Sequence, residues 1–180
     1  MSFAPLLAEK QIAFDTVVHP PAFTAQKRAK CLRLPGRQVA KAVLLVGPPG
    51  FLVAVLPATD QVDVMALANA LGGPVRLADA AEIAARFRDC EWGVVPPFGT
   101  LYGLPTLLED SLPPEALLVF KAHTHVEGIR MRCRDFEALE RPRRLHFAHP
   151  GRTPMTRPPR RGLSESEMFA PSAATPATGR

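Results

Sequence analysis

The sequence lacks the features of several large protein classes. No apolar run approaches the roughly 18 to 20 residues that a membrane-spanning helix needs, and the first ten residues lack the basic flank and cleavage pattern of a signal peptide. Its three cysteines, Cys31, Cys90 and Cys133, are odd in number and widely spaced. This spacing predicts neither a disulfide framework nor a cysteine metal knuckle. We therefore expect a cytoplasmic protein that does not bind a membrane.

Several well-known catalytic and nucleotide-binding signatures are also absent. The chain contains no Gly-x-Ser-x-Gly elbow, no P-loop and no GxGxxG motif. Aromatic residues are few at 7%, but 47% of the 180 residues are hydrophobic and 22% are charged. A chain of this length and composition is typical of one globular domain.

The positive charge of the chain is concentrated at its C-terminal end. Residues 141–180 hold eight basic and two acidic residues, which leaves 14 basic against 15 acidic residues in 1–140. The same 40 residues hold seven of the 20 prolines. Such a segment buries too little apolar surface to offset the entropy lost on ordering. The sequence therefore predicts a domain over 1–140 and a basic, disordered tail over 141–180.

Within 1–140, helical and strand periodicities alternate without a strict βαβ order, which favours an α+β domain on a mixed sheet. A Gly-Pro-Pro-Gly turn at 47–50 joins two strands that are apolar on both faces, which is typical of a β-hairpin in the centre of a sheet. Thr24 and Asp63 are expected to cap helices. The expected helices are 25–32, 64–71, 79–87 and one starting at Asp135, and the expected strands are 38–46, 51–56, 75–77, 117–124 and 126–133.

Lys41 is the most informative single residue. It lies in a strand whose other side chains are apolar on both faces, and burying an ammonium there costs several kcal/mol unless a partner receives it. One interpretation is a lysine that extends past the strand edge or pairs with a carboxylate such as Asp60. The other is a cation at the mouth of a pocket, directed at a phosphate, carboxylate or polarised carbonyl.

The segment 93–99, Gly-Val-Val-Pro-Pro-Phe-Gly, is the second candidate. Glycines allow close backbone approach to a ligand, and prolines hold the free N–H groups in fixed directions. Such a loop can bind an ester carbonyl and the oxyanion that forms during hydrolysis. The alternative is a rigid surface turn.

His123 and His125 form a His-x-His pair. Such a pair is half of a metal site, but no further ligand set at a suitable spacing accompanies it. We therefore expect no metal, and we expect one of the two histidines to line a pocket as a hydrogen-bonding or proton-transferring group.

Five segments together resemble the YbaK and prolyl-tRNA-synthetase-associated domain family, whose members deacylate mischarged tRNA. The resemblance covers about His19 to Leu139. The segments, in order, are HPPAFTAQ at 19–26, VAKAVLL at 39–45, AVLPA at 54–58, GVVPPFG at 93–99 and HTHVEGIRM at 123–131.

The resemblance implies a curved mixed sheet, flanked by helices, that forms a pocket for the aminoacyl-adenosine end of tRNA. It implies that Lys41 lies at the substrate ester, that Gly93 and Gly99 belong to the catalytic loop, and that Pro97 and Phe98 shape the aminoacyl pocket. His125 matches a histidine common in the family, whereas a small residue is usual at the position of His123. Both histidines are expected to contact the substrate.

The implied activity is that of a free-standing deacylase, without a cofactor, acting on tRNA mischarged with a small amino acid such as Ala, Cys or Ser. The implied partners are the mischarged tRNA and an aminoacyl-tRNA synthetase. Two alternatives stay open at this point: a non-catalytic module that binds a tRNA end or a nucleotide, and a metal hydrolase that uses His123 and His125.

Overall fold

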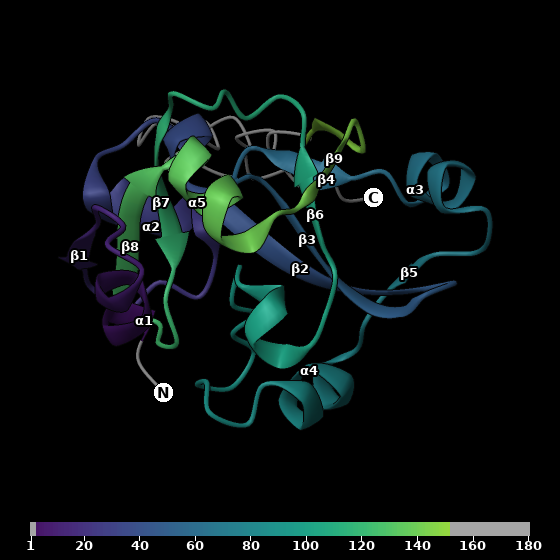
Figure 1. The fold of residues 1–180 in the computed structure, drawn as a ribbon, viewed down its shortest axis with the longest axis horizontal. Coiled ribbons are helices and arrows are strands. Elements are labelled where there is room, and N and C mark those ends of the chain that lie inside the picture. The colour runs from purple at the N-terminus through teal and green to yellow at the C-terminus, as the bar shows by residue number, and fades with distance from the viewer. Residues whose placement is uncertain (1–2, 152–180) are drawn as a thin grey trace, which may run out of the picture.

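The computed structural model describes residues 3–151, and these fold into two main sheets with helices packed around them (Figure 1). The larger sheet has five strands in the order β5-β2-β3-β6-β9, and the smaller has three in the order β1-β8-β7. The α+β class expected from the sequence is confirmed. Within this range no helix is long and apolar enough to cross a membrane.

The centre of the larger sheet is the predicted hairpin. Strands β2 (Ala40–Gly47) and β3 (Gly50–Pro57) pair antiparallel along their whole length, with Gly47 opposite Gly50. Strand β6 (Thr106–Glu109) pairs parallel with β3, and the short strand β5 (Arg76–Leu77) pairs antiparallel with β2. Residues of β3 contribute to core clusters on both faces, which is why its sequence is apolar throughout.

The smaller sheet is antiparallel. Strands β7 (Leu117–Lys121) and β8 (Glu127–Arg132) form the second predicted strand pair, and β1 (Asp15–Val18) adds to the other edge of β8. A single parallel bridge between Val39 and Val119 links this sheet to the start of β2. The link brings the end of β7 close to Lys41, although 80 residues of chain separate these two parts.

Two helices begin at the caps predicted from the sequence, and a third is capped by Asp79, the residue expected to start it. Thr24 caps α2 (Ala25–Leu32), Asp63 caps α3 (Val64–Leu71), and Asp79 forms a capping box with Glu82 at α4 (Ala80–Arg86). Helix α5 (Cys133–Glu140) begins two residues before the expected Asp135. Several elements were not expected from the sequence. They are helix α1 (Phe3–Glu9), the two short 3-10 segments η1 (Gly36–Gln38) and η2 (Gly99–Tyr102), and a two-stranded sheet of β4 (Asp60–Val62) with β10 (Ala148–Pro150).

The domain extends past the boundary expected at residue 140. Strand β9 (Arg143–Leu145) pairs with β6, and β10 (Ala148–Pro150) pairs with β4. Phe147 is 1% exposed in the core, and its backbone N–H donates to the buried carboxylate of Glu109 at 2.7 Å. This buried ring and the pairing of β9 and β10 hold the segment against the sheets, and a composition average over 40 residues conceals both features. The rest of the expected tail, 152–180, lies outside the described residues.

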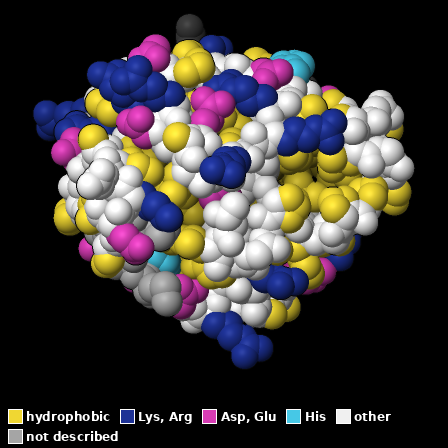
Figure 2. Space-filling view, in the orientation of Figure 1, with side chains coloured by type: hydrophobic (Ala, Val, Ile, Leu, Met, Phe, Trp, Pro, Cys, Tyr) yellow, Lys and Arg dark blue, Asp and Glu magenta, His cyan; other side chains and the backbone are white. Residues whose placement is uncertain are grey.

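The surface of the described region carries charges of both signs. On the face shown in Figure 2, Lys and Arg side chains lie interspersed with Asp and Glu. This agrees with the near balance of basic and acidic residues in 1–140. Charges of both signs are thus mixed on this face, and the local charges of the cavities are the better guide to a ligand.

Candidate functional site

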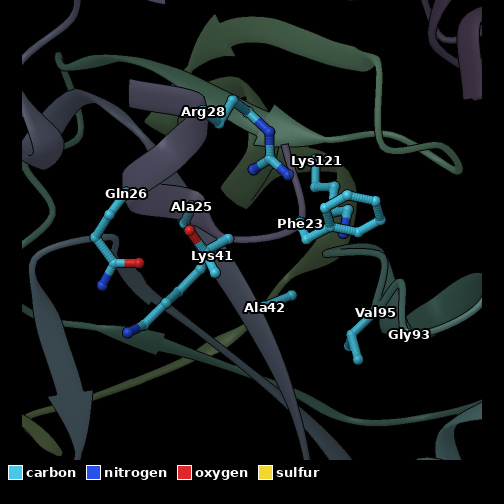
Figure 3. Close-up of a pocket in the computed structure, with 10 residues that line it drawn as sticks. Phe23, Ala25, Gln26, Arg28, Lys41, Ala42, Gly93, Val95 and Lys121 are labelled. Carbon is cyan, nitrogen blue, oxygen red and sulfur yellow. The ribbon is translucent and has the colours of Figure 1, made fainter. Parts of the chain in front are cut away.

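A pocket of about 220 Å³ lies where four separate segments meet (Figure 3). Its walls come from the segment leading into α2, from β2, from the loop after residue 92 and from the end of β7. The lining residues are Phe23, Thr24, Ala25, Gln26, Arg28, Lys41, Ala42, Gly93, Val95 and Lys121. Three of these ten are cationic and none is acidic, so the pocket favours a ligand that carries negative charge.

The first turn of α2 forms one wall because of its cap. Thr24 has extended backbone angles, and its hydroxyl accepts a hydrogen bond from the backbone N–H of Lys27 at 3.1 Å. This cap fixes the point at which the chain turns into the helix and holds Ala25 and Gln26 at the pocket. The partial positive charge of a helix N-terminus adds to that of the three cations.

Lys41 enters this pocket from β2. Its ammonium donates to the backbone carbonyl of Asp60, so the cation is anchored at Asp60, although not on the carboxylate that the first interpretation names. Burial lowers the pKa of Lys41, and the nearby Asp60 carboxylate partly opposes this effect. The same side chain lines the pocket, as the second interpretation expects.

Two further cations, Arg28 and Lys121, were missed in the sequence. Arg28 is 1% exposed and Lys121 is 8% exposed, yet both line the pocket. Lys121 ends a strand, Leu-Leu-Val-Phe-Lys, that is otherwise apolar, which is the same signal that identified Lys41. Arg28 follows two polar residues in a helix, so its burial has no comparable signal in the sequence.

The loop 93–99 contributes its first half to the site. Gly93 lines the pocket with a φ of +75°, a conformation that favours glycine, and Val95 lies beside it. Pro97, Phe98 and Gly99 are buried but do not line the pocket, unlike the expectation from the sequence. The Phe98 ring packs in the core with its centroid 4.8 Å from that of Phe3.

Gly99 has a packing role in this structure. A Cβ at this position would lie 2.5 Å from the Thr106 hydroxyl and 2.9 Å from the Leu104 carbonyl oxygen. The glycine therefore allows η2 to approach β6 closely. Its place beside Thr106 explains a glycine here without any contact to a ligand.

The two histidines have different surroundings. The Nδ1 of His125 lies 3.1 Å from the Lys121 ammonium, and its Nε2 lies 2.9 Å from the Trp92 carbonyl oxygen. His125 thus supports a lysine of the pocket wall without lining the pocket itself. His123 is stacked on Phe3, with ring centroids 3.6 Å apart, and is also absent from the lining.

His123 belongs to a different group of side chains. One ligand atom each from Asp89, Cys90 and His123 lies within 4.8 Å of the others, an arrangement of the kind that can hold a metal ion. None of these three residues lines the pocket. The metal hydrolase alternative relied on His123 together with His125, and the structure gives these two rings separate sets of partners.

The sequence was compared with models of known families. The model described as "Aminoacyl-tRNA editing domain" matches residues 19–139. The chain belongs to this family. All of the pocket-lining residues of this editing domain fall inside the matched range, whereas β9 and β10 lie beyond its end. A search of curated proteins returned no match.

Solved structures share the fold of this editing domain at low sequence identity. A hypothetical protein is 15% identical with a TM-score of 0.74, and the match covers 81% of this chain and 98% of that one. A protein proposed to be a trans-editing enzyme for prolyl-tRNA synthetase is 23% identical with a TM-score of 0.66, covering 76% and 87%. A proposed signal transduction protein from Marinobacter aquaeolei is 20% identical with a TM-score of 0.60, covering 80% and 30%.

Proposed function

We propose that this protein is a free-standing aminoacyl-tRNA deacylase that hydrolyses the ester of tRNA mischarged with a small amino acid such as Ala, Cys or Ser. The observation that carries the proposal is that Lys41 and Gly93 line the same pocket. These two residues come from segments about 50 positions apart, both lie within the matched range 19–139, and the sequence resemblance implies a functional role for each of them. The volume of about 220 Å³ suits a small group.

The reaction requires a water molecule to attack the ester carbonyl carbon. The tetrahedral oxyanion then collapses, the bond to the ribose oxygen breaks, and that oxygen takes up a proton as the free amino acid leaves. Lys41 positions the substrate by its charge, and the backbone N–H groups near Gly93 stabilise the developing oxyanion. No carboxylate or imidazole is among the lining residues of the described chain, which favours the 2′-hydroxyl of the terminal ribose as the group that activates water.

The test uses a panel of tRNAs mischarged with different amino acids and follows the loss of the labelled aminoacyl group. We expect the wild-type protein to deacylate one or more of them. The Lys41→Ala variant should lose at least about 100-fold in rate, because a positioned charge at the reacting group is typically worth several kcal/mol. Lys10→Ala, at an exposed lysine outside this pocket, is the matched control and should keep the wild-type rate.

The panel also decides between this function and a binding module. If the wild-type protein binds the tRNAs but hydrolyses none of them, the protein is a non-catalytic module. If Lys41→Ala retains its fold by circular dichroism and also retains wild-type rates, the role assigned to Lys41 is wrong. Two partners, a mischarged tRNA and a synthetase that produces it, follow from the same proposal.

A further inference from the structure

Arg28 is a buried cation without a partner in the described part of the chain. Its side chain is 1% exposed, and its Nε atom is buried with no hydrogen-bond partner. Neither a hydrogen bond nor an ion pair connects its guanidinium to any residue in the range 3–151. Figure 3 shows the guanidinium directed from α2 toward the pocket, near Lys121 and Phe23. Buried arginines are almost always paired, so this one has an unmet requirement for an anion.

Lys121 is a second buried cation near Arg28, and it increases the requirement for an anion at this place. Burial and the nearby Arg28 lower the pKa of its ammonium to about 8, with Glu91 and Cys90 acting in the opposite direction. Its ammonium lies 3.1 Å from the Nδ1 atom of His125, and an imidazole offers it no negative charge. The Glu91 carboxylate already accepts a hydrogen bond from the backbone N–H of His125 at 2.6 Å. Two cations therefore lie close together, and within residues 3–151 the carboxylate that acts on Lys121 is that of Glu91, which is already partly committed.

The charge of Lys121 is sensitive to several neighbours. Arg28 faces it from α2, Glu91 and Cys90 from the segment before the loop, and His125 from the turn before β8. His19, whose pKa is lowered mainly by burial and also by both cations, is a further titratable group near the pair. An anion bound between Arg28 and Lys121 would relieve the repulsion between them and keep Lys121 protonated.

Lys41 is a separate anchor point. Its ammonium donates to the Asp60 carbonyl, and Figure 3 shows its side chain extending toward Gln26, away from Arg28 and Lys121. The pocket thus has a cation at one end and a pair of cations at the other. A ligand with two polar or anionic groups, one reacting and one not, fits this distribution.

We propose that Arg28 and Lys121 form an oxyanion-binding subsite, distinct from Lys41, that takes a phosphate or carboxylate group of the ligand. Guanidinium and ammonium groups approach from two different elements, so an oxyanion with several oxygens can accept from both. The subsite itself follows from the two buried cations. Its assignment to the phosphate 5′ of the terminal adenosine rests on the proposed function, since Ala, Cys and Ser carry no side-chain oxyanion. A side-chain carboxylate, as in an acidic amino acid, is the other occupant that the test distinguishes.

Two matched pairs of small ligands test the subsite. Titration calorimetry at pH 7 compares AMP with adenosine and L-aspartate with L-asparagine, since each pair differs in the charged group. We expect the charged member of one pair to bind about tenfold or more tightly than its neutral counterpart, as charge-assisted hydrogen bonds to a buried guanidinium predict. A preference for AMP identifies the phosphate, and a preference for aspartate identifies the carboxylate. If neither charged ligand binds more tightly than its counterpart, or if none binds, the subsite does not exist.

Substitutions then assign the preference to Arg28. Arg28→Met keeps the apolar stem and removes the charge, so it should abolish the preference for the charged ligand and leave binding of the neutral one unchanged. Arg28→Lys should retain part of the preference, because a lysine keeps the charge but loses the bidentate geometry. Arg37→Met, the same change at an exposed arginine outside the pocket, is the matched control. A preference that survives in Arg28→Met overturns the proposal.

These results are independent of the deacylation panel. If the wild-type protein hydrolyses no mischarged tRNA but shows an Arg28-dependent preference for one charged ligand, the proposed function fails and the subsite stands. If it deacylates tRNA and Arg28→Met changes neither KM nor ligand preference, the function stands and the subsite fails.

Discussion

Replacing Arg28 by methionine should stabilise the free protein. Burial lowers the pKa of this guanidinium well below its ordinary value, to about 10, so the folded state disfavours its charged form. At about 1.36 kcal/mol per pKa unit, this difference corresponds to a penalty of roughly 3 kcal/mol. Methionine removes the charge and preserves most of the apolar contacts of the stem. We therefore expect the free energy of unfolding to rise by about 1 to 3 kcal/mol, as found when buried charges are replaced by apolar groups.

Urea unfolding at pH 7, in a buffer without phosphate, measures this difference. For a chain of this size the expected gain corresponds to an increase in Tm of roughly 2 to 12 °C. The folded-state pKa is below the unfolded one, so the penalty is fully present below about pH 10 and declines as the pH rises above it. Because burial together with Arg28 lowers the pKa of Lys121 to about 8, the gain should be constant below about pH 7 and should shrink as Lys121 loses its proton above about pH 8. Arg37→Met, at an exposed site, should change stability by no more than about 0.5 kcal/mol.

A result in the opposite direction would refute the reasoning. If Arg28→Met lowers the free energy of unfolding by 1 kcal/mol or more, the guanidinium has a favourable partner in the free protein and is not an unmet cation. The gain should also shrink when the ligand that prefers the wild-type protein is added, since binding stabilises only the folded state that binds it.

Further outcomes follow from the packing and from the charge of Lys121. Gly99→Ala should destabilise the fold by about 1 to 3 kcal/mol in urea unfolding, because its Cβ would overlap neighbouring atoms, whereas Gly47→Ala has contacts no shorter than 3.4 Å and should be nearly neutral. A chain truncated after Glu140 loses the buried Phe147 and should be less stable by roughly 3 to 5 kcal/mol or fail to fold, whereas a chain truncated after Gly151 should unfold like the full chain. Affinity for the preferred charged ligand should fall as the pH rises through about 8, where the ammonium of Lys121 loses its proton; calorimetry between pH 7 and 9.5 measures this, and a constant affinity would contradict it.

The part of the fold that the sequence determined is local. The Gly-Pro-Pro-Gly turn at 47–50 predicts the hairpin of β2 and β3, and Thr24, Asp63 and Asp79 predict the starts of three helices. These features depend on backbone conformations and hydrogen bonds within a few residues, so the sequence alone carries them. The short strands β4, β6, β9 and β10 were not predicted, because three or four residues show no measurable periodicity and their pairing depends on distant strands.

In the candidate site, too, some residues can be identified from the local sequence and others only from the tertiary structure. Lys41 was identified from the sequence because an ammonium among apolar strand residues is locally anomalous, and Gly93 because glycine and proline fix a loop. Arg28 gives no such local signal, since arginine is an ordinary residue in a helix whose neighbours are polar. Two tertiary features place Arg28 and Lys121 in the same pocket as Lys41. The bridge between Val39 and Val119 brings β7, and with it Lys121, against β2, and the cap of α2 sets the position of Arg28. Burial is a property of the assembled core, and for that reason the tertiary structure alone decides which of the 22 basic residues lack water and require an anion.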